Sequence, residues 1–142
     1  EKKETLYRYT VYSKQGKLLY EEKNVSKYPN IKKIQTDKFS VGISAGASTY
    51  LVRYFDVLNE KVSDVFMTPL DIMDNKIIWF DGKIVVQDIF DKSRYYKEIE
   101  LKASDAAFPI VFAQFLSADT IQIRYMTGYD YEEKTETFRL KK

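Results

Sequence analysis

Hydrophobic and polar residues alternate along almost the whole chain with a period of two, which is typical of β-strands whose two faces meet different surroundings. In the segment 5–12, TLYRYTVY, the residues Tyr7, Tyr9 and Val11 fall on one face with Arg8 between the first two. Very few apolar residues recur at the helical spacing of 3.6. The pattern therefore predicts an all-β protein made of antiparallel strands.

The predicted strands fall into an N-terminal hairpin and three units of three strands each. The hairpin covers 5–22, and a short strand lies near 31–35. The three-stranded units cover 39–66, 76–101 and 110–140. Asp81-Gly82 stands between two apolar runs of the second unit, and this dipeptide favours a tight hairpin turn.

The three units share an order of residue types: an apolar strand, a polar turn, and a charged strand that ends in an apolar residue. These shared segments begin at 49, 83 and 120, and a partial copy begins at 5. Self-similarity at such a period indicates repeat architectures. The arrangement resembles the strand pattern of β-propeller blades, which implies three to four related β-meander units.

The length of the chain limits that resemblance. A closed ring of four four-stranded blades needs roughly 160 residues or more, and the chain has 142. We therefore expect one all-β domain over 1–142, either as an open series of blade-like units or as a β-sandwich whose two sheets cover each other.

Composition narrows the chemistry that the chain can perform. It contains neither Cys nor His, which removes the commonest nucleophile–base pairs and the commonest ligands of transition metals. We accordingly predict no cofactor, no metal site and no enzymatic activity. A carboxylate-based hydrolase stays open as an alternative; its candidate residues are Asp56, Asp88, Glu98, Glu132, Glu133 and Glu136.

Charge is distributed unevenly, although the net charge is only +2. Residues 1–38 hold ten Lys and Arg against five Asp and Glu, whereas 39–142 hold thirteen against sixteen. Lys at strand edges keeps sheets from pairing with other chains. Eighteen of the basic residues are Lys and five are Arg, and because Arg is the better ligand for phosphates and bases, we expect no nucleic-acid partner.

Aromatic residues suggest the most specific site. The chain has twelve Tyr, nine Phe and one Trp, and such side chains make stacking and hydrogen-bonding surfaces for sugars or peptides. The predicted ligand-binding residues are Trp79, Tyr95, Tyr96, Tyr129 and Tyr131. The alternative is structural: Trp79 and Tyr125 pack in the core, and the others form cross-strand pairs.

These observations favour a non-enzymatic binding module whose partner is an extracellular protein or a glycan. A self-associating structural β module is a further alternative, because strand edges can pair with one another. No stretch is long and apolar enough to predict a membrane span. The chain begins with Glu1, so we expect that a leader was removed and that the protein is extracellular or on a bacterial cell surface.

Overall fold

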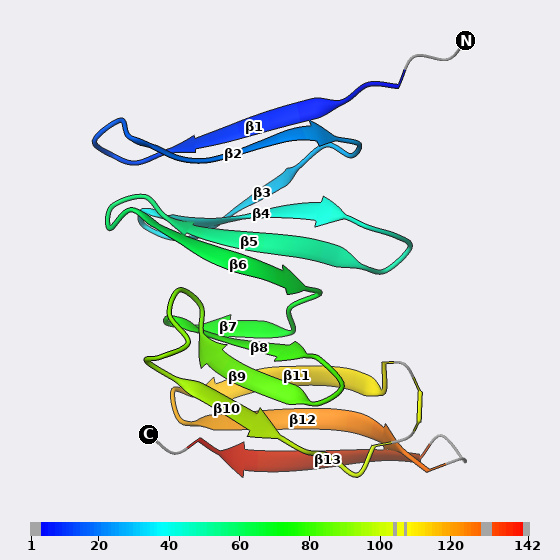
Figure 1. Ribbon diagram of the computed structural model, residues 1–142. Helices are drawn as coiled ribbons and strands as arrows, with labels where there is room; N and C mark the ends of the chain where they lie inside the picture. The colour runs from blue at the N-terminus through cyan, green and yellow to red at the C-terminus, as the bar shows by residue number, and fades with distance from the viewer. Residues whose placement is uncertain (1–3, 104, 107, 129–131, 141–142) are drawn as a thin grey trace. The chain divides into compact units, whose positions relative to one another are not determined.

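The computed structural model describes residues 4–103, 105–106, 108–128 and 132–140. This part of the chain contains thirteen strands in four antiparallel sheets, and no helix or closed barrel (Figure 1). The prediction of an all-β antiparallel protein is therefore confirmed. The chain divides into two compact units, unit 1 at 1–68 and unit 2 at 69–142.

Unit 1 consists of a hairpin and a four-stranded meander. The hairpin pairs β1 (Tyr7–Tyr12) with β2 (Leu18–Val25). The meander runs in chain order through β3 (Asn30–Gln35), β4 (Lys38–Ser44), β5 (Tyr50–Asp56) and β6 (Lys61–Met67). The hairpin forms a second layer over the meander, since the two share a hydrophobic core and the Lys14 N–H donates to the Val57 carbonyl at 2.9 Å.

The core of unit 1 follows directly from the alternation in the sequence. Val11 of the hairpin packs with Val41 and Phe55 of the meander, and all three are buried. The rings of Phe39 and Phe55 stack with centroids 5.3 Å apart. Tyr20 of β2 reaches the same cluster, with its ring centroid 5.7 Å from that of Phe55. The face predicted to be apolar in the first strand is thus the one that faces the meander.

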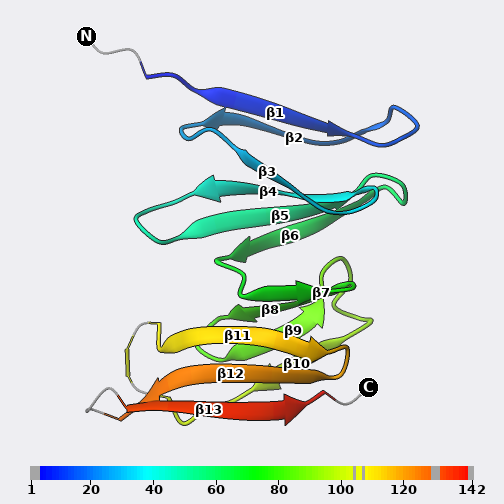
Figure 2. The same ribbon diagram turned by 180° about the vertical axis from the view of Figure 1, so that it is seen from behind.

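Unit 2 consists of two facing sheets, one of four strands and one of three. The first has the order β10–β9–β8–β7, and the second the order β11–β12–β13. Figure 2, seen from behind, brings the second sheet in front of the first. The strands are β7 (Asp71–Met73), β8 (Lys76–Phe80), β9 (Ile84–Asp88), β10 (Tyr96–Ile99), β11 (Ile110–Ser117), β12 (Thr120–Thr127) and β13 (Glu132–Arg139).

The core of unit 2 draws on both of its sheets. Eleven buried residues form one cluster, and Ile78, Ile84, Ile121 and Ile123 in it have no exposed surface. Polar contacts also join the sheets: the Asp71 carboxylate on β7 accepts the Phe115 N–H of β11 at 2.7 Å, and Lys97 Nζ on β10 donates to the Arg139 carbonyl of β13 at 3.1 Å. In unit 2 the two sheets therefore enclose a close-packed core, and its side chains come from alternate positions of the strands.

The strand pairing agrees with the predicted three-stranded units. The segments 39–66, 76–101 and 110–140 each form a consecutive antiparallel meander, and the hairpin at 5–22 is present. Two sheets gain a fourth strand at their edge, β3 and the unpredicted β7. Pairing order is not evidence of an internal repeat, so blade-like copies stay a prediction, as does the single domain over 1–142.

Glycine occupies only some of the turn positions that have a positive φ, and other residues occupy the rest. Gly82 has a φ of 70°, and the Asp81 N–H donates to the Lys83 carbonyl at 2.9 Å, which confirms the predicted Asp-Gly turn. Elsewhere non-glycine residues take the left-handed conformation, among them Asp37, Glu60 and Asp74. Asp and Asn accept this conformation at lower cost than most residues.

No helix in the described part of the chain has the length and apolar character that crossing a membrane requires.

Candidate functional site

A cavity of about 240 Å³ lies inside unit 1, between the hairpin and the meander. Its walls come from both layers: side chains of β1 and β2 on one side, and of β4, β5 and β6 on the other. The lining residues are Tyr9, Glu22, Lys23, Asn24, Val25, Ser26, Val41, Ile43, Leu51, Arg53 and Val65. The space is adjacent to the core of unit 1, with which it shares Val41.

The floor of the cavity is aliphatic and follows from strand register. Val41 pairs with Arg53, which in turn pairs with Val65, so these three form one row across β4, β5 and β6. Ile43 and Leu51 form the next row with the same orientation. Since side chains two positions apart share a face, the floor combines four aliphatic side chains with one guanidinium.

The hairpin side of the cavity holds a carboxylate that two tyrosines orient. The Tyr9 hydroxyl donates to Glu22 Oε2 at 2.9 Å, and the Tyr20 hydroxyl donates to the same oxygen at 3.2 Å. Burial, followed by the hydrogen bond to Glu22, raises the pKa of Tyr9 well above its usual value. Tyr9 therefore stays a neutral donor at physiological pH and holds the Glu22 carboxylate in place.

Arg53 is held at the opposite side by an irregularity in the meander. A register shift between β5 and β6 leaves Ser63 outside the regular ladder, and its carbonyl accepts Arg53 Nη1 at 2.8 Å. The Ser63 hydroxyl accepts the Tyr54 N–H at 2.8 Å, which compensates for the interrupted pairing. Bulges of this kind re-aim side chains, and here the freed carbonyl anchors the guanidinium.

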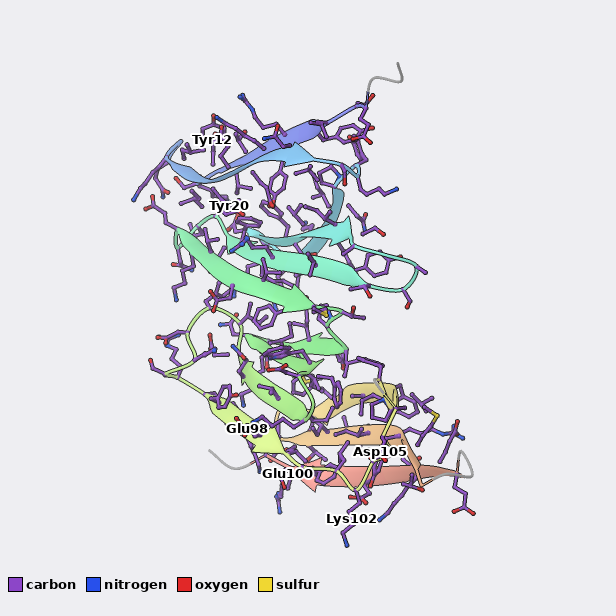
Figure 3. All side chains as sticks on the ribbon, turned by 45° about the vertical axis from the view of Figure 1, so that its right-hand side comes forward. Tyr12, Tyr20, Glu98, Glu100, Lys102 and Asp105 are labelled. Atoms are coloured by element: carbon purple, nitrogen blue, oxygen red, sulfur yellow. The ribbon has the colours of Figure 1, made fainter. Side chains whose placement is uncertain are left out.

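Tyr20 separates the two charged groups of the cavity. The Arg53 guanidinium carbon lies 4.5 Å from the centre of the Tyr20 ring, a cation–π contact. Glu22 is bound to the hydroxyl of the same ring. Figure 3 shows Tyr20 in the layer between the hairpin and the meander. Among the described residues no ion pair joins Glu22 to Arg53, so each charge keeps bonding capacity of its own.

Arg53 Nε is the unsatisfied donor of this site. It is buried and has no acceptor in the part of the chain that the structure describes. Leaving a buried donor without an acceptor is unfavourable, and the effect is larger for a charged group. The cavity thus joins an aliphatic floor, an oriented carboxylate and a guanidinium that has an unused donor.

The predicted aromatic residues do not form one group. Trp79 is half-buried on β8 and donates to Gln87 Oε1 at 3.0 Å. Tyr96 is 44% exposed on β10, opposite Gln87, and therefore shares the face of Trp79. Tyr95 precedes it and packs against the core of unit 2, so it belongs to the opposite face.

Tyr129 and Tyr131 lie outside the described residues. Tyr125 is buried in the core of unit 2, as the structural alternative predicts. The use of Trp79, Tyr95 and Tyr96 in ligand binding stays a prediction.

Three of the carboxylates considered for catalysis make contacts within the fold. Asp56 and Asp88 are buried and accept backbone N–H groups of the turns that follow them. Glu98 accepts the Tyr96 hydroxyl at 2.9 Å and pairs with Lys83 at 2.7 Å. The pKa values of Asp56 and Glu98 are lowered, the latter chiefly by the hydrogen bond from Lys83. Within the described residues, no three acidic side chains come together to hold a metal ion.

The sequence analysis did not single out Tyr9, Glu22 or Arg53 as site residues. These residues come from three strands, and only the fold brings them together. One signal was present: Arg53 interrupts the apolar face of 49–57, where alternation demands an inward side chain. A charged residue at an inward position is a candidate for function because its burial is costly unless it is paired.

Comparisons with known proteins give this chain no relative. No family model, no curated protein and no solved structure matches it.

Proposed function

We propose that this protein is a non-enzymatic binding module and that the cavity of unit 1 is its binding site. The observation that carries the proposal is the lining of that cavity. Ligand sites are concave and mostly apolar, with a few convergent polar groups that fix orientation. Five aliphatic residues line the unit 1 cavity, together with Tyr9 and polar residues that include Glu22 and Arg53.

Several contacts support a binding role over a purely structural one. A core position is stabilised by apolar contacts, whereas an unpaired charged group at such a position is destabilising. Arg53 occupies the middle of an otherwise aliphatic row, and its Nε has no acceptor among the residues that the structure describes. A negatively charged ligand group beside this guanidinium gives the arrangement a physical purpose.

The proposal is tested by a small-molecule screen observed through methyl resonances of the full chain. A ligand is expected to shift the methyl signals of Val41, Ile43 and Leu51, which line the cavity. The variant Val65→Trp fills the cavity from its rim, where Val65 is 44% exposed. This substitution is expected to abolish the shifts.

Val111 provides the matched control. It is also a strand valine, 47% exposed, but it lies in unit 2. Val111→Trp is expected to leave ligand binding unchanged. A complete screen without any shift of the cavity methyls overturns the proposal, and so does a set of ligands that bind Val65→Trp as tightly as the unmodified chain.

We also propose an extracellular or cell-surface location, on the compositional grounds given above. The carboxylate-based hydrolase and the self-associating module stay as alternatives that no contact described here favours.

A further inference from the structure

The lining of the unit 1 cavity includes the carboxylate of Glu22 and the guanidinium of Arg53. Lys23 also lines the cavity, and its ammonium pairs with Glu21 at 3.3 Å. Glu22 lies on the hairpin side and Arg53 on the meander side, and both contact Tyr20. One contact is at the hydroxyl of that ring and the other is over its face. The two charged groups therefore lie around one side chain, that of Tyr20.

We propose that the cavity binds a free α-amino acid with an aliphatic side chain. This inference rests on the proposed function and specifies its ligand class. The ligand carboxylate pairs with Arg53, the ligand ammonium with Glu22, and the side chain covers the aliphatic floor. Each of the three parts of the ligand meets a part of the cavity with matching chemistry.

Arg53 is suited to a carboxylate. Its Nη1 is engaged by the Ser63 carbonyl, whereas its Nε has no acceptor among the described residues. The guanidinium of Arg53 lines the cavity and matches a carboxylate in charge and in planar geometry. The anchor at Ser63 and the Tyr20 ring fix the plane of the guanidinium before a ligand arrives, which lowers the entropic cost of binding.

Glu22 is suited to an ammonium group. Its Oε2 accepts both tyrosine hydroxyls, and its Oε1 has no partner in the described part of the chain. The hydroxyls of Tyr9 and Tyr20 are used as donors to Glu22, so they are not available to donate to a ligand anion. A ligand group near Glu22 must therefore be a donor, and an ammonium offers three N–H bonds and a complementary charge.

The presence of both charges disfavours ligands with a single charge. An anion without an ammonium group meets the uncompensated carboxylate of Glu22, and a cation without a carboxylate meets Arg53. Like charges close together in a site of low polarity repel each other. A zwitterion avoids both effects.

The floor selects the rest of the ligand. Val41, Ile43, Leu51 and Val65 offer only aliphatic contact. A polar side chain would lose hydration there without gaining a hydrogen bond. An aliphatic side chain gains contact and is removed from water, which favours leucine, isoleucine or valine over polar amino acids.

The test uses isothermal titration calorimetry with three probes that share the isobutyl side chain of leucine. L-leucine has both charges, 4-methylpentanoate lacks the ammonium group, and 3-methylbutylamine lacks the carboxylate. L-leucine is expected to bind, and each analogue to bind at least about tenfold more weakly, because each loses a charge-assisted hydrogen bond. Equal affinity of L-leucine and either analogue overturns the proposal.

Two variants separate the roles of the charged residues. Glu22→Gln keeps an oxygen that accepts from the tyrosines but removes the charge. It is expected to weaken L-leucine at least about tenfold while strengthening 4-methylpentanoate, since the repulsion is gone. Arg53→Lys keeps the charge without the planar guanidinium and is expected to weaken both carboxylate probes.

A purely structural role of Glu22 predicts an equal loss for both probes, and that result overturns the proposal. Failure of all three probes while other compounds shift the cavity methyls overturns the amino-acid ligand and leaves the binding module standing. Failure of both experiments overturns the binding module as well.

Discussion

The two units use the same kind of strand but fill their interiors differently. In unit 2 a three-stranded sheet covers a four-stranded one, and eleven buried residues form the core cluster. In unit 1 a two-stranded hairpin covers a four-stranded sheet, and the corresponding cluster has three buried residues. Unit 1 also contains the cavity and Arg53, whose Nε has no hydrogen-bond partner in the described part of the chain.

The number of strands in the covering layer accounts for this difference. β13 is the third strand of the covering sheet in unit 2. It adds Phe138 and is followed by Leu140, and both side chains pack in the core. The hairpin of unit 1 lacks a third strand, so the inner face of the meander near Ile43 and Leu51 borders on the cavity. The smaller covering layer thus accompanies a cavity, and the larger one a packed core.

The largest test of the contrast is truncation of the unit 2 core. Ile123 has no exposed surface and lies in the middle strand of its sheet. Ile123→Ala is expected to lower the free energy of unfolding by about 3 kcal/mol through lost burial and the resulting cavity. Leu51→Ala, which enlarges an existing cavity in unit 1, is expected to cost less than about 1 kcal/mol.

Urea denaturation gives both values, and hydrogen exchange assigns each loss to its unit. Equal destabilisation by the two substitutions would mean that the interiors of the units are packed alike.

A second test addresses the hydrogen bond between Asp71 and the Phe115 N–H, which joins the two sheets of unit 2. Asp71→Ala removes the acceptor of the Phe115 N–H and is expected to lower the free energy of unfolding by about 2 kcal/mol, because the bond involves a charged group. Asp71→Asn keeps an oxygen acceptor and is expected to lose less than half of that. Faster exchange of the β11 amides in Asp71→Ala checks the assignment, and unchanged exchange there would contradict it.

The smallest expected effect concerns a tyrosine in each unit. Burial, followed by the hydrogen bond to Glu136, raises the pKa of Tyr125 to about 12. The unfolded chain loses this proton near pH 10. The stabilisation from neutral Tyr125 is therefore complete below about pH 10 and is lost as the pH rises towards 12.

Tyr125→Phe is expected to cost about 1 kcal/mol near pH 8 and to flatten the alkaline decline in the stability of unit 2. Tyr9→Phe is the unit 1 counterpart, because the pKa of Tyr9 is raised by the same causes. Urea denaturation at a series of pH values measures both. An alkaline decline that Tyr125→Phe leaves unchanged would assign it to other groups.

The sequence predicts the strands because alternation records which side chains face inward. The three meanders, the first hairpin and the Asp81-Gly82 turn all follow from local pattern and turn chemistry. The three-residue strand β7 was missed because DIM at 71–73 is too short to show a period. Local pattern also carries no information on which sheets face each other.

The site was less predictable than the fold. The aromatic residues were predicted to form one surface because of their type, but consecutive residues such as Tyr95 and Tyr96 point to opposite faces of an extended chain. The cavity depends on contacts between β2 and β5, which are distant in sequence. Arg53 interrupts an apolar face, which is a signal that the sequence contains. Glu22 follows Glu21 directly, and nothing in the sequence distinguishes the two carboxylates.

The contact between Asp71 and Phe115 can form only late in synthesis, after the strands of unit 1 are complete. Unit 1 has all of its strands once the chain has reached Met67. The Asp71 carboxylate has to wait for a partner 44 residues further along, and the core cluster of unit 2 is complete only at Leu140. All strands of unit 1, which contains the cavity, are therefore synthesised and able to fold while unit 2, which has the larger core cluster, is still being translated.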